Sequence, residues 1–406
     1  MSFQKSRLFL VVLVSSLLSI LIIPGAVNAQ INFEHGTWSE IKAKAKAENK
    51  LIFVDAYTTW CGPCKWMAKN VFTNDTVAAY YNSTFVNAKI DMEAGEGKDL
   101  AVLYKVRAYP SLLFVDANGD LVHKAVGSAP AADFVQLGKD ALVPEKQFGT
   151  LERKYKSGQR DLPFIKTYLA ALSELHQSTS EPLAGYLQTQ QDEALSSPEN
   201  WFLIHAYLTD PQSKSFIYLV KHPEAFVKRY SADTVNAKIY SVYVTECYRL
   251  IFSRKADSVD YLPLKEKIQQ SGFARKEELL LEADLAYYDK RHDSKSYAHT
   301  ATVYIDKYKG NDPNVLNNCS YFFYENVKDK VLLSRAEQWA KKGYTLDPNP
   351  STSMDTYACL LSVNGKKEEA IKLETAAIAQ IKAAPDKYDQ SGIGDMEKKI
   401  ASWSNK

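Results

Sequence analysis

Residues 51–65 read Leu-Ile-Phe-Val-Asp-Ala-Tyr-Thr-Thr-Trp-Cys-Gly-Pro-Cys-Lys, an apolar run followed by two cysteines with two residues between them. The apolar run, Leu51–Ala56, predicts a buried strand, and the cysteines open a helix predicted over Cys61–Val71. Thiols three residues apart in the first turn of a helix can form a small, readily opened disulfide, and the helix N-terminus stabilises a thiolate on Cys61. The pattern therefore predicts that Cys61 and Cys64 form a thiol–disulfide exchange site.

The start of the chain predicts where this site works. A basic segment, residues 1–7, precedes an apolar and serine-rich stretch, Leu8–Ile23, and a small-residue end at Ala29. That layout predicts a secretory signal peptide over residues 1–29. An uncleaved anchor helix is the alternative, although the apolar stretch is shorter than the roughly 20 residues that a spanning helix needs. Both interpretations place the two cysteines outside the cytoplasm, in the periplasm or beyond it, where disulfides form and persist.

Composition narrows the class of protein. The 406 residues include 50 Lys and Arg and 48 Asp and Glu, and the predicted signal removes two of the basic residues. A balanced charge argues against nucleic acid as a partner. After the signal, no apolar run is long enough to cross a bilayer, so the mature chain is not expected to span a membrane. The other cysteines, Cys247, Cys319 and Cys359, are expected to be buried in helices, with a Cys319–Cys359 bridge left open as an alternative.

Residues 31–142 alternate helix and strand signals. A capping box at Thr37–Glu40 opens a helix that runs to about Glu48. The turn Asn118-Gly119 is a strong hairpin signal, and Pro130 stands at the start of a closing helix. Together these elements predict an α/β fold, with one mixed sheet and helices on both faces. Besides Leu51–Ala56, strands are expected at 85–91, 111–115 and 121–126.

After Pro144 the strand signals stop, and the rest of the chain predicts consecutive helices. Near the end, Ala336 and Ala370 are 34 residues apart, and so are Gly343 and Ala377. Small residues at this period let paired helices approach closely, and the pattern resembles the tetratricopeptide repeat. The predicted domains are therefore a signal peptide, an α/β domain, an all-helical region without a visible period, and repeat-like helical hairpins, over 1–29, 30–144, 145–275 and 276–406.

Within the α/β domain, the order of motifs resembles the thioredoxin family. Asp55 stands six residues before the first cysteine, and Trp60-Cys61-Gly62-Pro63-Cys64-Lys65 is followed by the Pro110 segment and the hairpin. The resemblance covers a little over a quarter of the chain, and it is closest to the C-terminal thioredoxin-like domain of bacterial transmembrane disulfide reductases. Typical thioredoxins carry a proline five residues after the second cysteine, where this chain has Lys69. That departure puts the partner set of a typical thioredoxin in doubt.

The resemblance implies a role for each residue of the site. Cys61 is expected to be the exposed nucleophile and Cys64 the resolving thiol. Asp55, at the end of a buried strand, is expected to accept the proton of Cys64. Pro110 is expected to be a cis-proline that faces the dithiol and leaves the neighbouring backbone free to pair with an extended substrate. Trp60 is expected to shield one side of the pair.

Each assignment has a simpler alternative. Two cysteines at this spacing are also half of a zinc site, but no second pair follows and no histidine lies within twenty residues after them. Asp55 could be a solvated strand-end residue, and Tyr109-Pro110 could be an ordinary trans turn. Gly95-Glu96-Gly97-Lys98 lacks the spacing of a phosphate-binding loop. The sequence therefore predicts no cofactor, and without a second cysteine pair it predicts no metal.

The leading functional hypothesis is an enzyme, an extracytoplasmic thiol–disulfide oxidoreductase that reduces or rearranges protein disulfides. The resemblance implies a reducing potential near roughly −270 mV, because Gly-Pro is the pair that thioredoxins carry between their cysteines. Such a reductase needs disulfide-bearing client proteins and a membrane dithiol donor. A disulfide oxidase or isomerase is one alternative. The other is an adaptor, in which the helical region binds a partner and the thioredoxin-like domain is a secondary module. The oligomeric state is left open.

Overall fold

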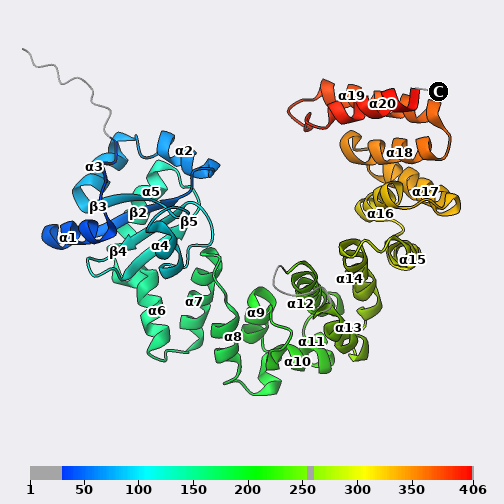
Figure 1. The fold of residues 1–406 in the computed structure, drawn as a ribbon. Helices are drawn as coiled ribbons and strands as arrows, with labels where there is room; N and C mark the ends of the chain where they lie inside the picture. The colour runs from blue at the N-terminus through cyan, green and yellow to red at the C-terminus, as the bar shows by residue number, and fades with distance from the viewer. Residues whose placement is uncertain (1–29, 254–259, 405–406) are drawn as a thin grey trace, which may run out of the picture. The chain divides into compact units, whose positions relative to one another are not determined.

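The structure is a computed structural model that describes residues 30–253 and 260–404 (Figure 1). The predicted signal peptide, residues 1–29, lies outside the described residues. The chain divides into two compact units, Met1–Ser178 and Thr179–Lys406. Of the described helices, none combines the length and the apolar character that a membrane crossing demands.

The first unit is built on a five-stranded mixed sheet in the order β1-β3-β2-β4-β5, which confirms the predicted α/β fold. Central strand β2 pairs in parallel with β3 and antiparallel with β4, so its five interior residues are buried. Three strands, β3, β4 and β5, have the bounds that the sequence predicts. The strands are β1 (Phe33–Glu34), β2 (Leu51–Tyr57), β3 (Phe85–Asp91), β4 (Ser111–Val115) and β5 (Leu121–Val126).

Helices cover both faces of this sheet, and the alternation of β2 side chains separates two cores. Val54 points into a core that also holds Ile41 of α1 and Leu100 of α4. Phe53 points to the opposite side, into an aromatic core with residues of α2, α3 and α5. Because strand side chains alternate, Asp55 lies on the same face as Phe53, the face that α2 covers. These helices are α1 (Trp38–Glu48), α2 (Gly62–Asn70), α3 (Asp75–Thr84), α4 (Gly97–Leu103) and α5 (Ala131–Asp140).

Two further helices, α6 (Phe148–Lys156) and α7 (Leu162–Glu174), belong to the same compact unit. Helix α6 packs closely on strand β5. A Cβ on Gly149 would stand 2.3 Å from the carbonyl oxygen of Leu121, so only glycine fits there. The Phe148 N–H also donates to Nδ1 of His123, at 3.2 Å. The first unit is therefore larger than the sheet and its five flanking helices.

The second unit contains helices and no strand in residues 179–253 and 260–404. Towards its end consecutive helices pack on each other, α16 on α17 and α18 on α19. The regularly spaced Ala336 and Ala370 are both fully buried in this packing. The helices are α8 (Ser180–Leu187), α9 (Pro198–Tyr207), α10 (Lys214–Lys221), α11 (Pro223–Val227), α12 (Ala232–Phe252), α13 (Tyr261–Gln270), α14 (Lys276–Lys290), α15 (Ser294–Tyr304), α16 (Pro313–Asn326), α17 (Lys330–Leu346), α18 (Asp355–Val363), α19 (Lys367–Ala383) and α20 (Ile393–Ser404).

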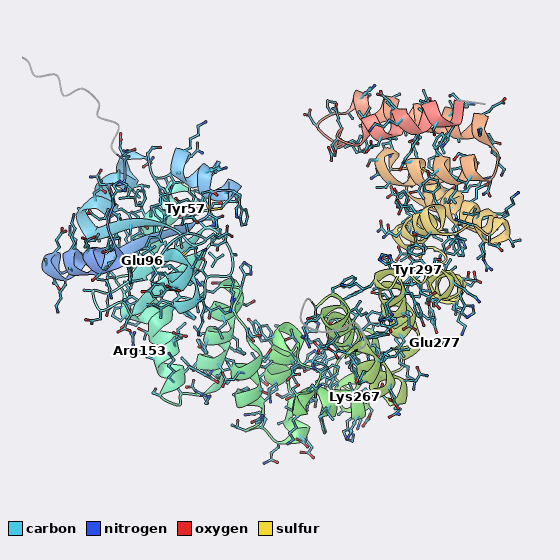
Figure 2. All side chains as sticks on the ribbon, viewed as in Figure 1. Tyr57, Glu96, Arg153, Lys267, Glu277 and Tyr297 are labelled. Atoms are coloured by element: carbon cyan, nitrogen blue, oxygen red, sulfur yellow. A yellow bond between two sulfur atoms is a disulfide. The ribbon has the colours of Figure 1, made fainter. Side chains whose placement is uncertain are left out.

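The lone cysteines lie in this helical unit, and all three are buried and unpaired. Cys319 accepts a hydrogen bond from the Tyr297 hydroxyl, whose position on α15 is marked in Figure 2. Burial raises the pKa of Cys319 to about 11 and that of Cys359 to about 12, which suppresses the thiolate form of each. Their prediction as packing residues is confirmed, and the alternative Cys319–Cys359 bridge is absent from the structure.

Candidate active site

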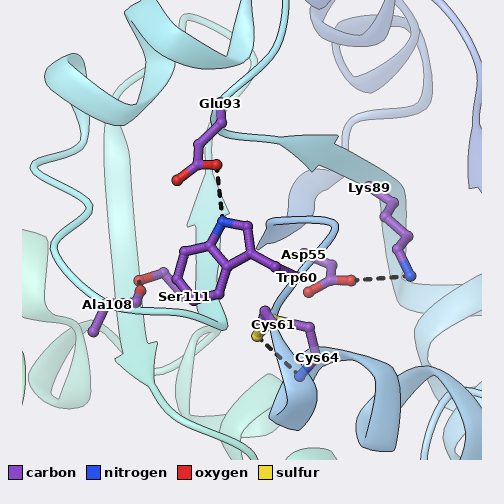
Figure 3. Close-up of a disulfide and its surroundings, with 8 residues drawn as sticks. All are labelled: Asp55, Trp60, Cys61, Cys64, Lys89, Glu93, Ala108 and Ser111. Atoms are coloured by element: carbon purple, nitrogen blue, oxygen red, sulfur yellow. Dashed lines mark hydrogen bonds and ion pairs between the residues drawn. A yellow bond between two sulfur atoms is a disulfide. The ribbon is translucent and has the colours of Figure 1, made fainter.

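Cys61 and Cys64 are joined by a disulfide at the N-terminus of α2 (Figure 3). Cys61 is the N-cap residue, and its sulfur accepts a hydrogen bond of 3.1 Å from the Cys64 N–H. Pro63 sits in the first turn, where its missing N–H costs no hydrogen bond. After reduction, the same N–H and the helix dipole are placed to stabilise a thiolate on Cys61.

The exposure of the first cysteine differs from the expectation. Cys61 is 2% exposed and Cys64 is 3% exposed, so the predicted exposed nucleophile is wrong for this disulfide form. The N-cap position is the physical reason, because it turns the Cys61 sulfur back over the first helical turn, towards Cys64. The neighbours Trp60, Gly62 and Pro63 do reach solvent.

Asp55 is fully buried on β2, so it is not the solvated strand-end residue of the simpler alternative. Neither of its carboxylate oxygens has a hydrogen-bond partner. The nearest charge is Lys89 on β3, whose Nζ lies 3.5 Å from Oδ2 (Figure 3). Burial raises the pKa of Asp55 from 3.8 to about 6, although the Lys89 charge acts in the opposite direction. A carboxyl with this pKa can release and take up a proton near neutral pH.

Lys89 connects the buried carboxyl with solvent. Its side chain is 29% exposed, and its ammonium lies over the ring of Tyr57 at 4.9 Å from the centroid. Lys89 lines a cavity of about 600 Å³ beside the active-site helix, together with Tyr57, Phe72 and Ala68. The Lys89 side chain therefore borders both this cavity and the buried carboxyl. Among the described residues, it is the cation that lowers the pKa of Asp55.

Replacing Lys89 with methionine is expected to raise the pKa of Asp55 further, because the attraction that opposes burial is lost. A ¹³C NMR titration of the aspartate carboxyl, followed through the upward shift of its midpoint, measures the change. Lys69→Met, an exposed substitution on α2, is the matched control and should leave the midpoint in place. An unchanged midpoint in the Lys89→Met variant would contradict the role of this ion pair.

Trp60 is the most prominent exposed side chain of the site, with 65% of its surface accessible. Its indole N–H donates to Oε2 of Glu93 at 2.9 Å. The ring also meets Tyr109 edge-on, with centroids 5.9 Å apart. Two contacts from different segments therefore hold an exposed aromatic ring next to the disulfide, and Figure 3 shows the one with Glu93.

The Tyr109–Pro110 peptide bond is cis, so the ordinary trans turn is not what the structure contains. The segment before β4 is closed by a hydrogen bond of 2.8 Å from the Ser111 hydroxyl to the Ala108 carbonyl. The Pro110 carbonyl accepts the Gly127 N–H at 2.9 Å. Ala108 and Ser111 flank the cis bond and lie in the surroundings of the disulfide that Figure 3 draws.

Sequence reasoning singled out neither Lys89 nor Glu93. The signal for Lys89 was the strand register, because β2 and β3 pair from Leu51 and Phe85 onward and so bring Asp55 opposite Lys89. Register follows from three-dimensional pairing and not from either strand alone. Glu93 lies in the connection after β3, where no motif marks it.

Comparison with known proteins identifies the family. The family model described as a thioredoxin-like domain matches residues 38–142. Thioredoxin-1 of Saccharomyces cerevisiae is 41% identical over 88 residues, which are 22% of this chain and 79% of that protein. The thiol:disulfide interchange protein DsbD of Colwellia psychrerythraea is 31% identical over 129 residues, covering 28% of this chain and 21% of that protein.

A further curated relative and a solved structure match the same part of the chain. Thioredoxin-1 of Drosophila melanogaster is 43% identical over 72 residues, covering 18% of this chain, and the chain spans 63% of that protein. Among solved structures, a provisionally named disulphide-isomerase from Bacteroides thetaiotaomicron is 43% identical, covers 29% of this chain and 98% of its own, and has a TM-score of 0.28. The chain belongs to the thioredoxin-like family through residues 38–142.

Proposed function

We propose that the protein is an extracytoplasmic thiol–disulfide oxidoreductase that reduces or rearranges protein disulfides. The observation that carries this proposal is the Cys61–Cys64 disulfide at a helix N-terminus, on the face of the sheet where a buried carboxyl, Asp55, has no hydrogen-bond partner. The thioredoxin-like family membership supports the same chemistry.

The reaction consists of two exchanges. In the first, the Cys61 thiolate attacks a client disulfide, one client sulfur leaves as a thiolate and takes up a proton, and a mixed disulfide forms. In the second, Cys64 loses its proton to Asp55 and attacks the Cys61 sulfur, which releases the other client sulfur. Two electrons pass from the dithiol to the client, and the site is left as the disulfide that the structure contains. Cys61 must become accessible for the first exchange, which is a requirement of this proposal.

Three features support the exchange, its direction and its compartment. Gly62-Pro63 between the cysteines favours a reducing couple, and a reductase outside the cytoplasm needs a membrane dithiol donor to restore Cys61 and Cys64. The relative from Colwellia psychrerythraea is named a thiol:disulfide interchange protein, which agrees with such an exchange. The predicted signal peptide supports a periplasmic or secreted location.

The redox chemistry is assigned to residues 30–144, and the helical region is proposed to guide partner choice. The packing of α16 on α17 and of α18 on α19, with buried alanines at the period of 34, supports hairpins like those of the tetratricopeptide repeat. Arrays of such hairpins present extended surfaces to protein partners. Oxidase or isomerase activity and a pure adaptor role are the competing functions.

Titration of the full-length protein against glutathione or dithiothreitol buffers tests the reductase. We expect a potential near roughly −270 mV, together with reduction of insulin disulfides when a chemical dithiol is supplied. A potential near roughly −120 mV would replace the reductase with an oxidase. A protein that reduces neither insulin nor a small disulfide would favour the adaptor.

A further inference from the structure

The segment that leads into cis-Pro110 begins at an unusual helix end. Helix α4 is followed by Lys105 in the left-handed region, with a φ of 49°. The Lys105 N–H donates to the Val102 carbonyl and the Val106 N–H to the Ala101 carbonyl, which together form a Schellman cap. Glycine is the usual residue at this position, so lysine carries a backbone cost that its other contacts must offset.

A buried lysine holds this helix end from the sheet side. Lys124 lies on β5 opposite Leu113 of β4 and is 3% exposed. Its ammonium donates to the carbonyl oxygens of Tyr104 at 3.1 Å and Lys105 at 2.9 Å. A buried ammonium is costly unless it is hydrogen-bonded, so these two carbonyls and the cation depend on each other.

Helix α6 holds Lys105 as well, through its side chain. Glu152 of α6 pairs with the Lys105 ammonium at 3.2 Å. The helix itself is fixed to β5 by Gly149 and by the hydrogen bond from Phe148 to His123. Its position in the first unit is marked by Arg153 in Figure 2. Lys105 is thus anchored through its carbonyl by β5 and through its side chain by α6.

The far end of the segment is also fixed, at the disulfide. Tyr109 contacts the exposed Trp60 ring, and the Pro110 carbonyl is bonded to Gly127. Only Val106, Arg107 and Ala108 lie between Lys105 and Tyr109. A displacement of Lys105 would therefore be transmitted over a few residues to the backbone beside cis-Pro110.

We propose that Lys124 and the Glu152–Lys105 pair are positioning elements for residues 104–110, so that helix α6 sets how well the redox site receives an extended protein client. The protein client in this inference comes from the proposed function, whereas the positioning role rests on the contacts alone. It assigns to α6, which follows the family match, a part in the working of the thioredoxin-like domain.

The test uses full-length Glu152→Gln and Lys124→Met. For insulin reduction we expect KM to rise about two- to fivefold in the first variant, from the loss of an exposed ion pair, with kcat unchanged. In the second we expect a rise of roughly tenfold, because charge-assisted hydrogen bonds are lost. Reduction of a small aromatic disulfide and the redox potential of Cys61–Cys64 should stay at the wild-type values.

Hydrogen exchange of the amides in residues 105–109 gives a readout that does not depend on turnover. Exchange should be faster in both variants and unchanged in Lys146→Met, which removes a comparably exposed ion pair, with Asp140, away from this segment. Unchanged exchange and unchanged KM in Glu152→Gln would overturn the proposal, even if Lys124→Met fails to fold. If the wild type reduces nothing, the proposed function fails, and the exchange rates still decide the positioning role.

Discussion

Replacing Cys64 with alanine is expected to abolish turnover and to leave client proteins covalently attached to Cys61. The first exchange needs only the Cys61 thiolate, whereas release needs the second sulfur one turn further along α2. Mixed disulfides should therefore accumulate in the variant and be absent from the wild type. Non-reducing electrophoresis followed by mass spectrometry of the captured species measures this and names the clients.

Two controls make the trapping result specific. The double variant Cys61→Ala/Cys64→Ala should capture nothing, because the attacking sulfur is gone. Cys319→Ala in the Cys64→Ala background should capture the same clients, since the Cys319 thiol is buried and its pKa is raised to about 11. Cys61 is only 2% exposed in the disulfide form, so its accessibility after reduction needs a test of its own. If reduced Cys61 does not react with iodoacetamide and the trap is empty, the exchange chemistry is refuted.

Replacing Asp55 with asparagine is expected to raise the free energy of unfolding of the oxidised first unit by about 3 kcal/mol at pH 7. Burial raises the pKa of this carboxyl from 3.8 to about 6, and each unit corresponds to about 1.4 kcal/mol. At pH 7 the native protein carries an ionised carboxylate without a hydrogen bond, and asparagine removes that charge with little change of shape. The free energy of unfolding of the first unit is measured in urea by pulse proteolysis, which follows this unit separately from the helical unit.

The pH dependence has a definite sign. The native state keeps the Asp55 proton up to about pH 6, whereas the unfolded chain releases it near 4, so the contribution of this group to stability falls as pH rises between these values. The gain from Asp55→Asn should be absent below about pH 4 and complete above about pH 6. Asp133→Asn, an exposed substitution on α5, should change stability by less than about 0.5 kcal/mol. A variant no more stable than the wild type at pH 7 would contradict a buried, ionised carboxylate that accepts no hydrogen bond.

Asp55→Asn should also slow catalysis, although it stabilises the fold. Asparagine cannot take the Cys64 proton, so release of the client becomes the slow step. Opposite effects on stability and on turnover distinguish a functional carboxylate from a packing residue.

Much of the first unit was predictable because its strands are bounded by strong local signals. The β4–β5 hairpin turns at Asn118-Gly119, and the α1 capping box places both hydrogen bonds where the sequence predicts them. Cys61, Cys64 and Asp55 were found because their spacing along one strand and one helix is local. Local spacing survives folding, so these residues needed no knowledge of tertiary contacts.

What could not be predicted depends on pairing between distant segments. The partners Lys89 and Lys124 follow from register, which places them opposite Asp55 and Leu113. The low exposure of Cys61 depends on how the first turn of α2 closes. The position of α6 on β5 was also hidden, because helical periodicity shows which face is apolar but not which surface it will cover.

The contact of Gly149 with the Leu121 carbonyl has a consequence for solubility. Strand β5 is the last in the sheet, and an uncovered outermost strand is a template on which a second molecule can add its own strand. Helix α6 lies against this strand. A fragment cut where the family resemblance stops, at residue 142, would bare the strand to self-association, whereas one that runs to residue 178 keeps it covered.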